Sequence, residues 1–196
     1  MVVGIDVDGI LSNFTEAFAD LLIKVSGENK MPEGFAWNTV PTWYWDKEFG
    51  YTDETSKECW TRIKSDPYFW LKLKPLPGAK EFLEKLANHA HEVYFITDRP
   101  GLYTQLQTLT WLDPVFPGAC VIISRKGKGI AAKALSLDVY LDDKVENIED
   151  MWEISPGTDT FMLKYPYNAT LQESMGDRAV SSLEEFAERT RLWENN

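Results

Sequence analysis

Two aspartates near the start of the chain have the type and spacing to do chemistry. They lie in Val2-Val3-Gly4-Ile5-Asp6-Val7-Asp8-Gly9-Ile10-Leu11, where a short apolar run leads into Asp6 and Asp8 and then a glycine. Residues i and i+2 of a strand point to the same side. If Ile5 ends a buried strand, Asp6 lies at its carboxyl edge, where open parallel sheets place their ligands. Gly9 allows a sharp turn and leaves backbone N–H groups free to face an anion.

Two further polar pairs follow predicted strands. Thr97-Asp98 comes at the end of the run Glu92–Thr97, and Asp142-Asp143 follows Val139–Leu141. Taken alone, the Asp-x-Asp-Gly stretch could be an exposed acidic turn, but parallel strands bring all three pairs to one sheet edge. Carboxylates that face one another cannot all stay ionised without a counter-charge. A hard divalent cation with oxygen ligands supplies that charge, and we expect Mg²⁺.

The chemistry that such a group of residues supports is phosphoryl transfer. A carboxylate nucleophile can form an aspartyl-phosphate. A second acid two residues further on can protonate the leaving alkoxide and then help to deprotonate water. A hydroxyl and backbone N–H groups can hold the phosphoryl oxygens, and a lysine can neutralise developing charge. The candidate lysines are Lys126, Lys128 and Lys133 before the fourth strand and Lys144 after it.

The elements that position these residues alternate between strands and helices along most of the chain. This alternation predicts an α/β fold with a doubly wound, Rossmann-like parallel sheet of about five strands. We expect the opening strand to be followed by strands at 92–97, 119–123, 139–141 and 160–163. We expect helices at 12–25, 79–88, 102–112, 129–136 and 145–153, and a last one that begins at Ser181 or Ser182 with a capping box and runs to Trp193.

Residues 28–75 differ from the rest of the chain in composition and in predicted secondary structure. They contain Pro and Gly breaks, no clear strand, and eleven aromatic residues between Phe35 and Trp70. We interpret them as a small, mainly helical cap inserted after the first strand, with 1–27 and 76–196 as the core domain. A short insertion needs bulky side chains to build its own core. We expect Trp37, Trp43, Trp45 and Trp60 to form most of that core, and Phe14, Phe69 and Trp70 to face a substrate.

Composition narrows the class of protein. The 196 residues carry a net charge of −11, which disfavours binding to long nucleic acids but leaves small phosphate esters open. No apolar run approaches the roughly 20 residues of a membrane span, and no signal peptide is apparent. These features predict a cytoplasmic protein without a membrane partner; the oligomeric state stays open, a homodimer included. Cys59 and Cys120 are predicted to be buried and inert, and we assign no role to His89 and His91.

Together, four segments of the chain resemble the motifs of the haloacid dehalogenase superfamily of phosphatases. They are the Asp6–Leu11 stretch, the strand that ends at Thr97, a lysine before the fourth strand, and Leu141-Asp142-Asp143. The resemblance implies that Asp6 is the nucleophile and Asp8 the general acid/base. Dehalogenases of the superfamily lack an acid at the position of Asp8.

The same resemblance implies roles for the remaining motif residues. Thr97 would be the phosphate-binding hydroxyl, and Lys128, which opens the helix at Gly129, would be the lysine. Asp143 would be a metal ligand beside the Asp6 carboxylate and the Asp8 backbone carbonyl. Asp142 would support this metal site, and Asn147 would brace it from one helical turn further on.

A narrower resemblance is to the 5'(3')-deoxyribonucleotidase family, in which an aromatic-lined insertion covers the nucleotide. After Thr97, Asp98-Arg99-Pro100 replaces the small polar residue and proline expected there. We count Gly9, Asp98 and Arg99 among the residues near the substrate, and Arg99 could add a cation to the site or pair with Asp98. The segments that carry the resemblance are Asp66-Pro67-Tyr68-Phe69-Trp70, Leu76-Pro77-Gly78-Ala79, Val93–Thr97 and Tyr165-Pro166-Tyr167-Asn168.

These observations predict a Mg²⁺-dependent 5'-nucleotidase that acts on nucleoside monophosphates, with deoxyribonucleotides favoured. One alternative is a phosphatase of the same superfamily for another small phosphate ester, such as a sugar phosphate. Another is a catalytically idle binding module on this fold. The intact set of Asp6, Asp8, Thr97 and Asp143 argues against the idle module, because binding alone does not need a proton donor.

Overall fold

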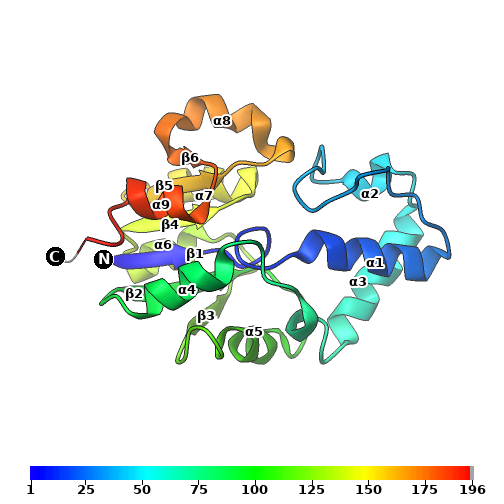
Figure 1. Ribbon diagram of the computed structural model, residues 1–196, viewed down its shortest axis with the longest axis horizontal. Helices are drawn as coiled ribbons and strands as arrows, with labels where there is room; N and C mark the ends of the chain where they lie inside the picture. The colour runs from blue at the N-terminus through cyan, green and yellow to red at the C-terminus, as the bar shows by residue number, and fades with distance from the viewer. Residues whose placement is uncertain (195–196) are drawn as a thin grey trace.

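The computed structural model describes residues 1–194 and contains one parallel sheet of six strands (Figure 1). The doubly wound α/β prediction is confirmed, with one strand more than expected. The added strand has only two residues, which is too short to show an alternating pattern. The strands lie in the order β3 (Cys120–Ile123), β2 (Glu92–Thr97), β1 (Val2–Ile5), β4 (Val139–Asp142), β5 (Asp159–Leu163) and β6 (Ala179–Val180).

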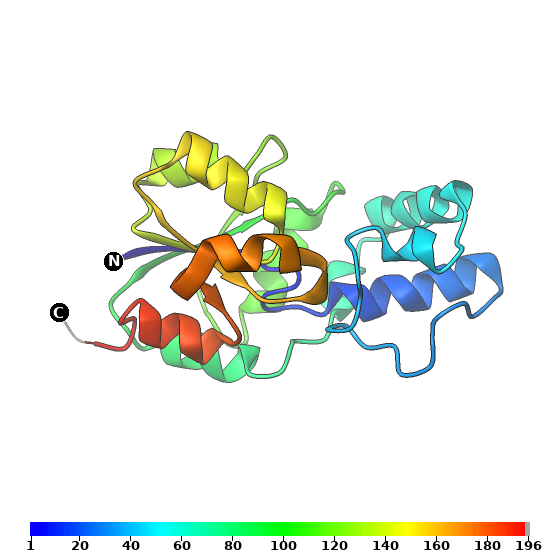
Figure 2. The ribbon, with the colours of Figure 1, turned by 90° about the horizontal axis from the view of Figure 1, so that it is seen from above.

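Helices cover both faces of the sheet (Figure 2). Neighbouring residues of a strand face opposite sides: in β2, Phe95 packs into the cluster formed with α4 and α9, and Ile96 into the cluster on the side of α6 and α7. Both faces are therefore buried, as parallel sheets require. The helices around the sheet are α4 (Ala79–Ala87), α5 (Thr104–Leu112), α6 (Gly129–Leu135), α7 (Val145–Ile154), α8 (Ala169–Met175) and α9 (Leu183–Arg189). Single 3₁₀ turns lie at Pro166–Asn168 and Gly176–Arg178.

A smaller helical layer lies beyond the carboxyl edge of the sheet (Figures 1 and 2). It holds α1 (Phe14–Ser26), α2 (Trp45–Glu48), α3 (Asp53–Ser65) and a 3₁₀ turn at Trp70–Lys72. Its apolar cluster joins Phe18 and Leu22 of α1 to Cys59 and Ile63 of α3. The division into 1–27 with 76–196 and 28–75 stays a prediction; the packing of α1 favours a boundary near Asn13, which caps that helix.

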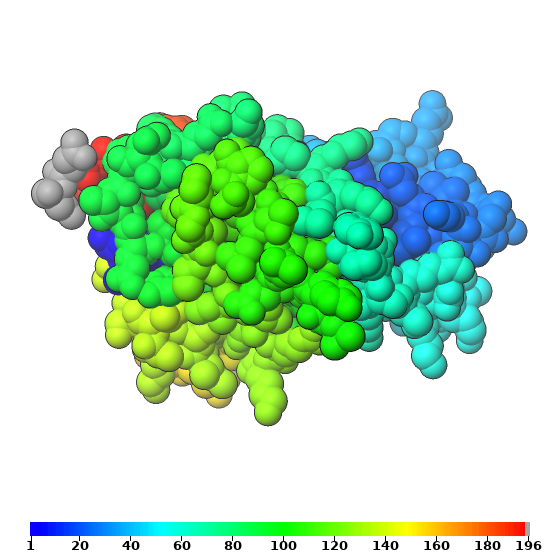
Figure 3. Space-filling view, turned by 90° about the horizontal axis from the view of Figure 1, so that it is seen from below, coloured from blue at the N-terminus to red at the C-terminus, as the bar shows by residue number. Residues whose placement is uncertain are grey.

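The chain returns from this layer to the sheet alongside α5. Gln107 accepts a hydrogen bond from the Trp70 backbone N–H (2.9 Å) and donates one to the Asp66 carbonyl (3.2 Å). Trp111 donates from its indole nitrogen to the Leu73 carbonyl (2.8 Å). Figure 3 shows this contact, with the green surface of α5 against the segment that follows α3. The helical layer is thereby held against the core at a second place besides α1.

Two local predictions need correction. Cys120 is exposed, because it begins β3 at the edge of the sheet, whereas Cys59 is buried as expected. The last helix begins after Ser182, which caps it, but ends at Arg189 rather than Trp193.

Among residues 1–194, no helix combines the length and the apolar character needed to cross a membrane.

Candidate active site

Asp6 and Lys128 form the centre of the site, at the carboxyl edge of the sheet. Asp6 directly follows β1, the strand between β2 and β4, so the ends of all three strands meet around it. The ammonium of Lys128 lies 2.6 Å from Asp6 Oδ1 and 2.7 Å from Asp142 Oδ2. All three side chains are almost completely buried. The predicted convergence of the Asp6 and Asp142 strand ends is therefore confirmed, and Lys128 lies between them.

Lys128 is held at the start of α6 by a residue that the sequence did not single out. Asp150 of α7 accepts a hydrogen bond from the Gly129 backbone N–H through Oδ2 (2.6 Å). A Cβ atom at Gly129 would lie 2.6 Å from the Asp150 carbonyl oxygen, so only glycine fits there. Lys126 and Lys133 are exposed to solvent. The structure thus favours Lys128 among the candidate lysines before β4.

Asp142 has its hydrogen-bonding capacity filled by the protein. Oδ1 accepts the backbone N–H groups of Asp143 and Lys144 (both 2.9 Å), and Asn147 donates its amide to Oδ1 (3.0 Å). Oδ2 accepts Lys128 and the Tyr140 hydroxyl. Burial alone would raise the pKa of Asp142, but Lys128 and these hydrogen bonds lower it below its usual value. Asp142 therefore orients Lys128, and Asn147 contacts it as predicted.

Asp143, in contrast, keeps one carboxylate oxygen without a partner. Its Oδ1 is buried and makes no hydrogen bond within residues 1–194, while Oδ2 accepts the Tyr167 hydroxyl. Gly9 passes close to this carboxylate: its φ is +83°, and a Cβ atom there would lie 2.5 Å from Asp143 Oδ2. Asn168 fixes the Asp143 backbone by donating to its carbonyl (2.8 Å). An unpartnered buried oxygen beside other carboxylates is a feature that a bound cation explains.

The charges of the site fit a divalent cation. Asp6, Asp142 and Asp143 each place a carboxylate oxygen within 4.8 Å of the others. When all three are ionised, three negative charges face the one positive charge of Lys128, which leaves an excess of two. Burial, with the charge of Asp142 added, raises the pKa of Asp143 to about 7. Burial also raises the pKa of Asp6 well above its usual value, against the opposing effect of Lys128.

Asp8 turns toward a different cation, Arg99. The guanidinium donates from Nε to Asp8 Oδ2 and from Nη2 to Asp8 Oδ1, both at 2.8 Å. Ser12 donates to Asp8 Oδ1 (2.7 Å) and accepts from Arg99 Nη2 (2.9 Å). The interpretation that Arg99 pairs with Asp98 is wrong, since Asp98 is exposed and Arg99 contacts Asp8 instead.

Arg99 lies in a buried pocket that gives its guanidinium further contacts besides those to Asp8 and Ser12. Nη1 donates to the Thr108 hydroxyl (3.0 Å), and the guanidinium lies 4.8 Å from the centre of the Trp70 ring. The Arg99 side chain has no exposed surface. With all these contacts made inside the protein, the geometry does not favour the predicted contact of Arg99 with substrate. No sequence signal links it to Asp8, because the two residues lie 91 positions apart.

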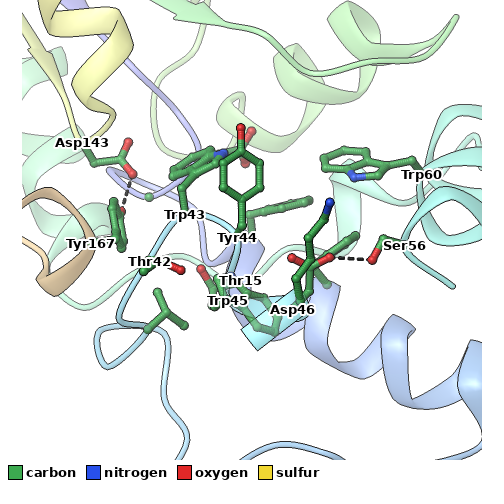
Figure 4. A pocket seen from close by; sticks show the side chains of 16 residues that line it. Thr15, Thr42, Trp43, Tyr44, Trp45, Asp46, Ser56, Trp60, Asp143 and Tyr167 are labelled. Carbon is green, nitrogen blue, oxygen red and sulfur yellow. Dashed lines mark hydrogen bonds between the residues drawn. The ribbon is translucent and has the colours of Figure 1, made fainter. Parts of the chain in front are cut away.

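Two adjoining cavities open beside these residues. The first, which we call the acid cavity, has a volume of about 230 Å³. The second, the aromatic cavity, has a volume of about 260 Å³, is lined in part by Gly9, and has Asp143 and Tyr167 at one end (Figure 4). Asp8, Phe14, Trp43 and Trp60 line both cavities, which makes them neighbouring parts of one depression. The acid cavity is also lined by Asp6, Thr97, Asp98, Arg99, Pro100, Trp70, Lys128, Lys144 and Asn147.

The aromatic residues divide between core and cavity differently from the prediction. Trp45 is buried as expected, but Trp43 is 42% exposed and, with Trp60, lines both cavities. Phe14 lines both cavities as predicted and stacks on Trp60, with ring centres 5.5 Å apart. Phe69 differs from the prediction, because it is not one of the described residues that line the two cavities. Composition alone could not separate these rings, because all of them are large and apolar, and the choice between core and cavity depends on how the short helices of this layer pack.

The family model of the 5' nucleotidase, deoxy (Pyrimidine), cytosolic type C proteins matches residues 1–188. A Bacillus cereus protein named "Putative nucleotidase" is 36% identical over 64 residues, 33% of each chain. A protein of the same name from Oceanobacillus iheyensis is 31% identical over 101 residues, 49% of this chain and 53% of its own length. The matches thus span between a third and about half of the length of these curated relatives.

Solved structures show the same fold at low sequence identity. A haloacid dehalogenase family hydrolase from Deinococcus radiodurans, with bound phosphate and sodium, aligns with a TM-score of 0.62 and 16% identity over 98% of this chain and 96% of its own. A haloacid dehalogenase-like hydrolase from Streptococcus pneumoniae aligns with a TM-score of 0.65 and 13% identity over 96% and 97%. The chain therefore has the haloacid dehalogenase fold and belongs to the family of cytosolic type C deoxy (pyrimidine) 5' nucleotidases.

Proposed function

We propose that this protein hydrolyses the phosphate ester of nucleoside monophosphates, deoxyribonucleotides included, by way of an aspartyl-phosphate on Asp6. The observation that carries the proposal is the wall that the two cavities share. Asp8 lines both the acid cavity, with Asp6 and Lys128, and the aromatic cavity, with Phe14 and Trp60. A phosphate beside Asp6 therefore leaves the rest of the molecule next to flat apolar rings. A nucleobase gains from stacking on such rings, whereas a sugar phosphate presents only hydroxyl groups.

The first half-reaction uses Asp6, Asp8 and Thr97. The Asp6 carboxylate attacks the phosphorus, the ester P–O bond breaks, and Asp8 gives its proton to the leaving nucleoside oxygen. The Thr97 hydroxyl, at the end of β2 in the acid cavity, would donate to a phosphoryl oxygen. Lys128, 2.6 Å from Asp6, offsets the negative charge that gathers around the phosphorus.

The second half-reaction regenerates the carboxylate of Asp6. Asp8, now ionised, takes a proton from a water molecule that attacks the phosphorus of the aspartyl-phosphate. The P–O bond to Asp6 breaks, and inorganic phosphate leaves. Arg99 and Ser12 hold the ionised Asp8 carboxylate in one orientation for this step.

Mg²⁺ is the cofactor that we propose for this site. Asp6 and the unpartnered Oδ1 of Asp143 would supply side-chain ligands, and the Asp8 backbone carbonyl would supply a third. The cation would shield the phosphoryl oxygens from the surrounding carboxylates. Asp142 holds Lys128 and is not assigned as a ligand, because its own oxygens are engaged.

A phosphate-release screen tests the proposed function. All common ribo- and deoxyribonucleoside monophosphates, several sugar phosphates and p-nitrophenyl phosphate are assayed with Mg²⁺ and with EDTA. We expect mononucleotides to give the highest kcat/KM, and EDTA to abolish turnover. Asp6→Asn should lose all activity because no carboxylate remains to accept the phosphoryl group. Preference for a sugar phosphate would contradict the proposal, as would residual Asp6→Asn activity above about a tenth of the wild-type rate.

A further inference from the structure

The side chain of Asp143 accepts a single hydrogen bond within residues 1–194. Its Oδ2 accepts the hydroxyl of Tyr167, and its buried Oδ1 has no partner. Asn168, the next residue along, donates to the Asp143 backbone carbonyl (2.8 Å). Both donors belong to the 3₁₀ turn at Pro166–Asn168, which follows β5. This turn therefore holds the backbone of Asp143 and one of its two carboxylate oxygens.

Tyr167 is itself held by two aromatic rings. Tyr165 stacks on it, with ring centres 5.0 Å apart and planes inclined by 10°. Trp43 meets it at a steep angle of 74°, with ring centres 5.6 Å apart. Figure 4 shows Trp43 beside the hydrogen-bonded pair of Tyr167 and Asp143. Trp43 comes from the loop between α1 and α2, so the position of the Tyr167 ring depends on the helical layer.

Tyr165 has a matching set of contacts. Trp37, from the same loop as Trp43, packs against its ring with centres 5.6 Å apart. The Tyr165 hydroxyl donates to the Gly9 backbone carbonyl (2.7 Å), on the loop that passes close to the Asp143 carboxylate. The two stacked tyrosines are thus fixed to the core at their hydroxyl groups and contacted by rings of the helical layer.

We propose that Tyr167 is a positioning residue for the cation site and that Trp43 acts on this site through it; the inference rests on the Mg²⁺ site of the proposed function. A carboxylate whose Oδ2 is bound to a hydroxyl keeps its plane and presents only Oδ1 to a cation. The cation then binds a ligand that is already ordered, which raises its affinity. The helical layer contributes to cation binding in this way, although every assigned ligand belongs to the core.

Tyr167→Phe isolates the hydroxyl, because it keeps the ring and its stacking. We expect the Kd for Mg²⁺ to rise by about tenfold or more, the usual effect of removing a group that orients a metal ligand. The measurement is the thermal midpoint over a series of MgCl₂ concentrations at pH 7.5 without substrate, since a cation that binds only the folded state raises the midpoint according to its Kd.

Tyr51→Phe is the matched control. Tyr51 is a buried tyrosine of the helical layer whose hydroxyl donates to the Glu28 backbone carbonyl (3.1 Å) instead of a carboxylate. Its removal should lower the midpoint without MgCl₂ and leave the Kd for Mg²⁺ unchanged. A general loss of stability is thereby separated from a loss of cation affinity.

Trp43→Ala tests the link to the helical layer. Trp43 is 42% exposed, so its removal leaves the apolar cores intact while freeing the Tyr167 ring. We expect the Kd for Mg²⁺ to rise several-fold, and the same substitution in Tyr167→Phe to add less than about twofold, because the hydroxyl that Trp43 acts through is already absent. Trp43 also contacts the Lys144 ammonium, 4.8 Å from its ring centre. Effects that multiply in the double variant would therefore show a route through Lys144 and overturn the role of Tyr167 in the link.

The outcomes separate this inference from the proposed function. An unchanged or lower Kd in Tyr167→Phe overturns the positioning role, and an unchanged Kd in Trp43→Ala overturns the link. If Tyr167→Phe does not fold, as judged by circular dichroism, the Kd of Trp43→Ala alone decides in the same way. A wild-type midpoint that MgCl₂ does not move overturns both this inference and the proposed cofactor. A preference for sugar phosphates in the phosphate-release screen overturns the proposed substrate and leaves the cation site as it is.

Discussion

Arg99 binds the Asp8 carboxylate through two hydrogen bonds from one guanidinium. Nε donates to Oδ2 and Nη2 donates to Oδ1, each over 2.8 Å. The planar fork of arginine matches a carboxylate in this way, and the paired bonds fix the plane of the acid as well as its position. Trp70 and Thr108 hold the guanidinium in turn. The orientation of the proposed proton donor is therefore set by residues from the loop after β2, the helical layer and α5.

Arg99→Lys should lower kcat for nucleotides by on the order of tenfold to a hundredfold while changing KM little. Lysine keeps the positive charge but cannot form the two parallel hydrogen bonds, so Asp8 loses its fixed orientation. The loss should be smaller for p-nitrophenyl phosphate, whose leaving group needs little help from a proton donor. Asp8→Asn should show the same dependence on the leaving group, and the ratio of the two substrates' kcat values is the measurement that checks it.

Thr108→Val is a milder test of the same arrangement. It removes the acceptor for Arg99 Nη1 but leaves both bonds to Asp8, so it should shift the substrate ratio in the same direction by a smaller factor. If Arg99→Lys instead raises KM for every substrate and leaves kcat intact, Arg99 acts on substrate binding and not through Asp8.

Lys128→Ala should reduce kcat by on the order of 10²-fold or more, as the loss of a preorganised transition-state contact typically does. Lys126→Ala is the matched control, because it removes a lysine two residues away whose side chain is exposed. It should stay within about twofold of the wild type, since surface charges that contact nothing contribute little. Steady-state assays, together with thermal unfolding of each variant, check the prediction. A large loss in Lys126→Ala would move the essential lysine to that position.

The alternation of strands and helices and the place of the acids at strand ends could be predicted because local pattern determines both. Apolar runs such as Val2–Ile5 become buried parallel strands, and the polar residue that ends each run then lies at the shared carboxyl edge. The same reasoning located Asp6, Thr97 and Asp143. Lys128 was favoured on a different ground, the resemblance to the haloacid dehalogenase superfamily, which implies a lysine at the start of this helix.

Contacts between distant side chains could not be predicted in the same way. Nothing in the sequence near Arg99 indicates that it reaches Asp8 rather than its neighbour Asp98, since the choice depends on the pocket made by Trp70 and Thr108. The support of Lys128 by Asp150 likewise depends on how α6 packs against α7. In the aromatic segment, the burial of each ring depends on how short helices and the loops between them pack, which hydrophobic periodicity does not describe.

Trp60→Ala should raise KM for nucleoside monophosphates several-fold, because it removes a ring that lines both cavities and stacks on Phe14. Stacking of a base on an aromatic ring contributes roughly 1–3 kcal/mol. Phe69→Ala is the matched control. The Phe69 ring packs against the apolar cluster of the helical layer, so its removal should lower the stability of the protein more than it raises KM. Hydrolysis of p-nitrophenyl phosphate should change little in either variant that remains folded. Equal KM changes in the two variants would mean that Trp60 is structural.

The last prediction concerns Asp143 and the dependence of stability on pH. Its pKa in the folded protein is raised from 3.8 to about 7, chiefly by burial. Between these two values the folded state binds more protons at this group than the unfolded state does. The contribution of Asp143 to the free energy of unfolding therefore falls as pH rises from about 4 to about 7. Without a cation, ionised Asp143 destabilises the protein at pH 7.5.

Asp143→Asn should accordingly raise the thermal midpoint in EDTA at pH 7.5 and change it less at pH 5. For a chain of this length, each kcal/mol corresponds to roughly 2–4 °C. Addition of Mg²⁺ at pH 7.5 should raise the midpoint of the wild type and leave that of Asp143→Asn nearly unchanged, because a cation that binds only the folded state stabilises it, and more so the lower its Kd. Thermal unfolding of both proteins at the two pH values, in EDTA and in Mg²⁺, makes the comparison. Equal stabilisation of the two proteins by Mg²⁺ would show that Asp143 is not a ligand.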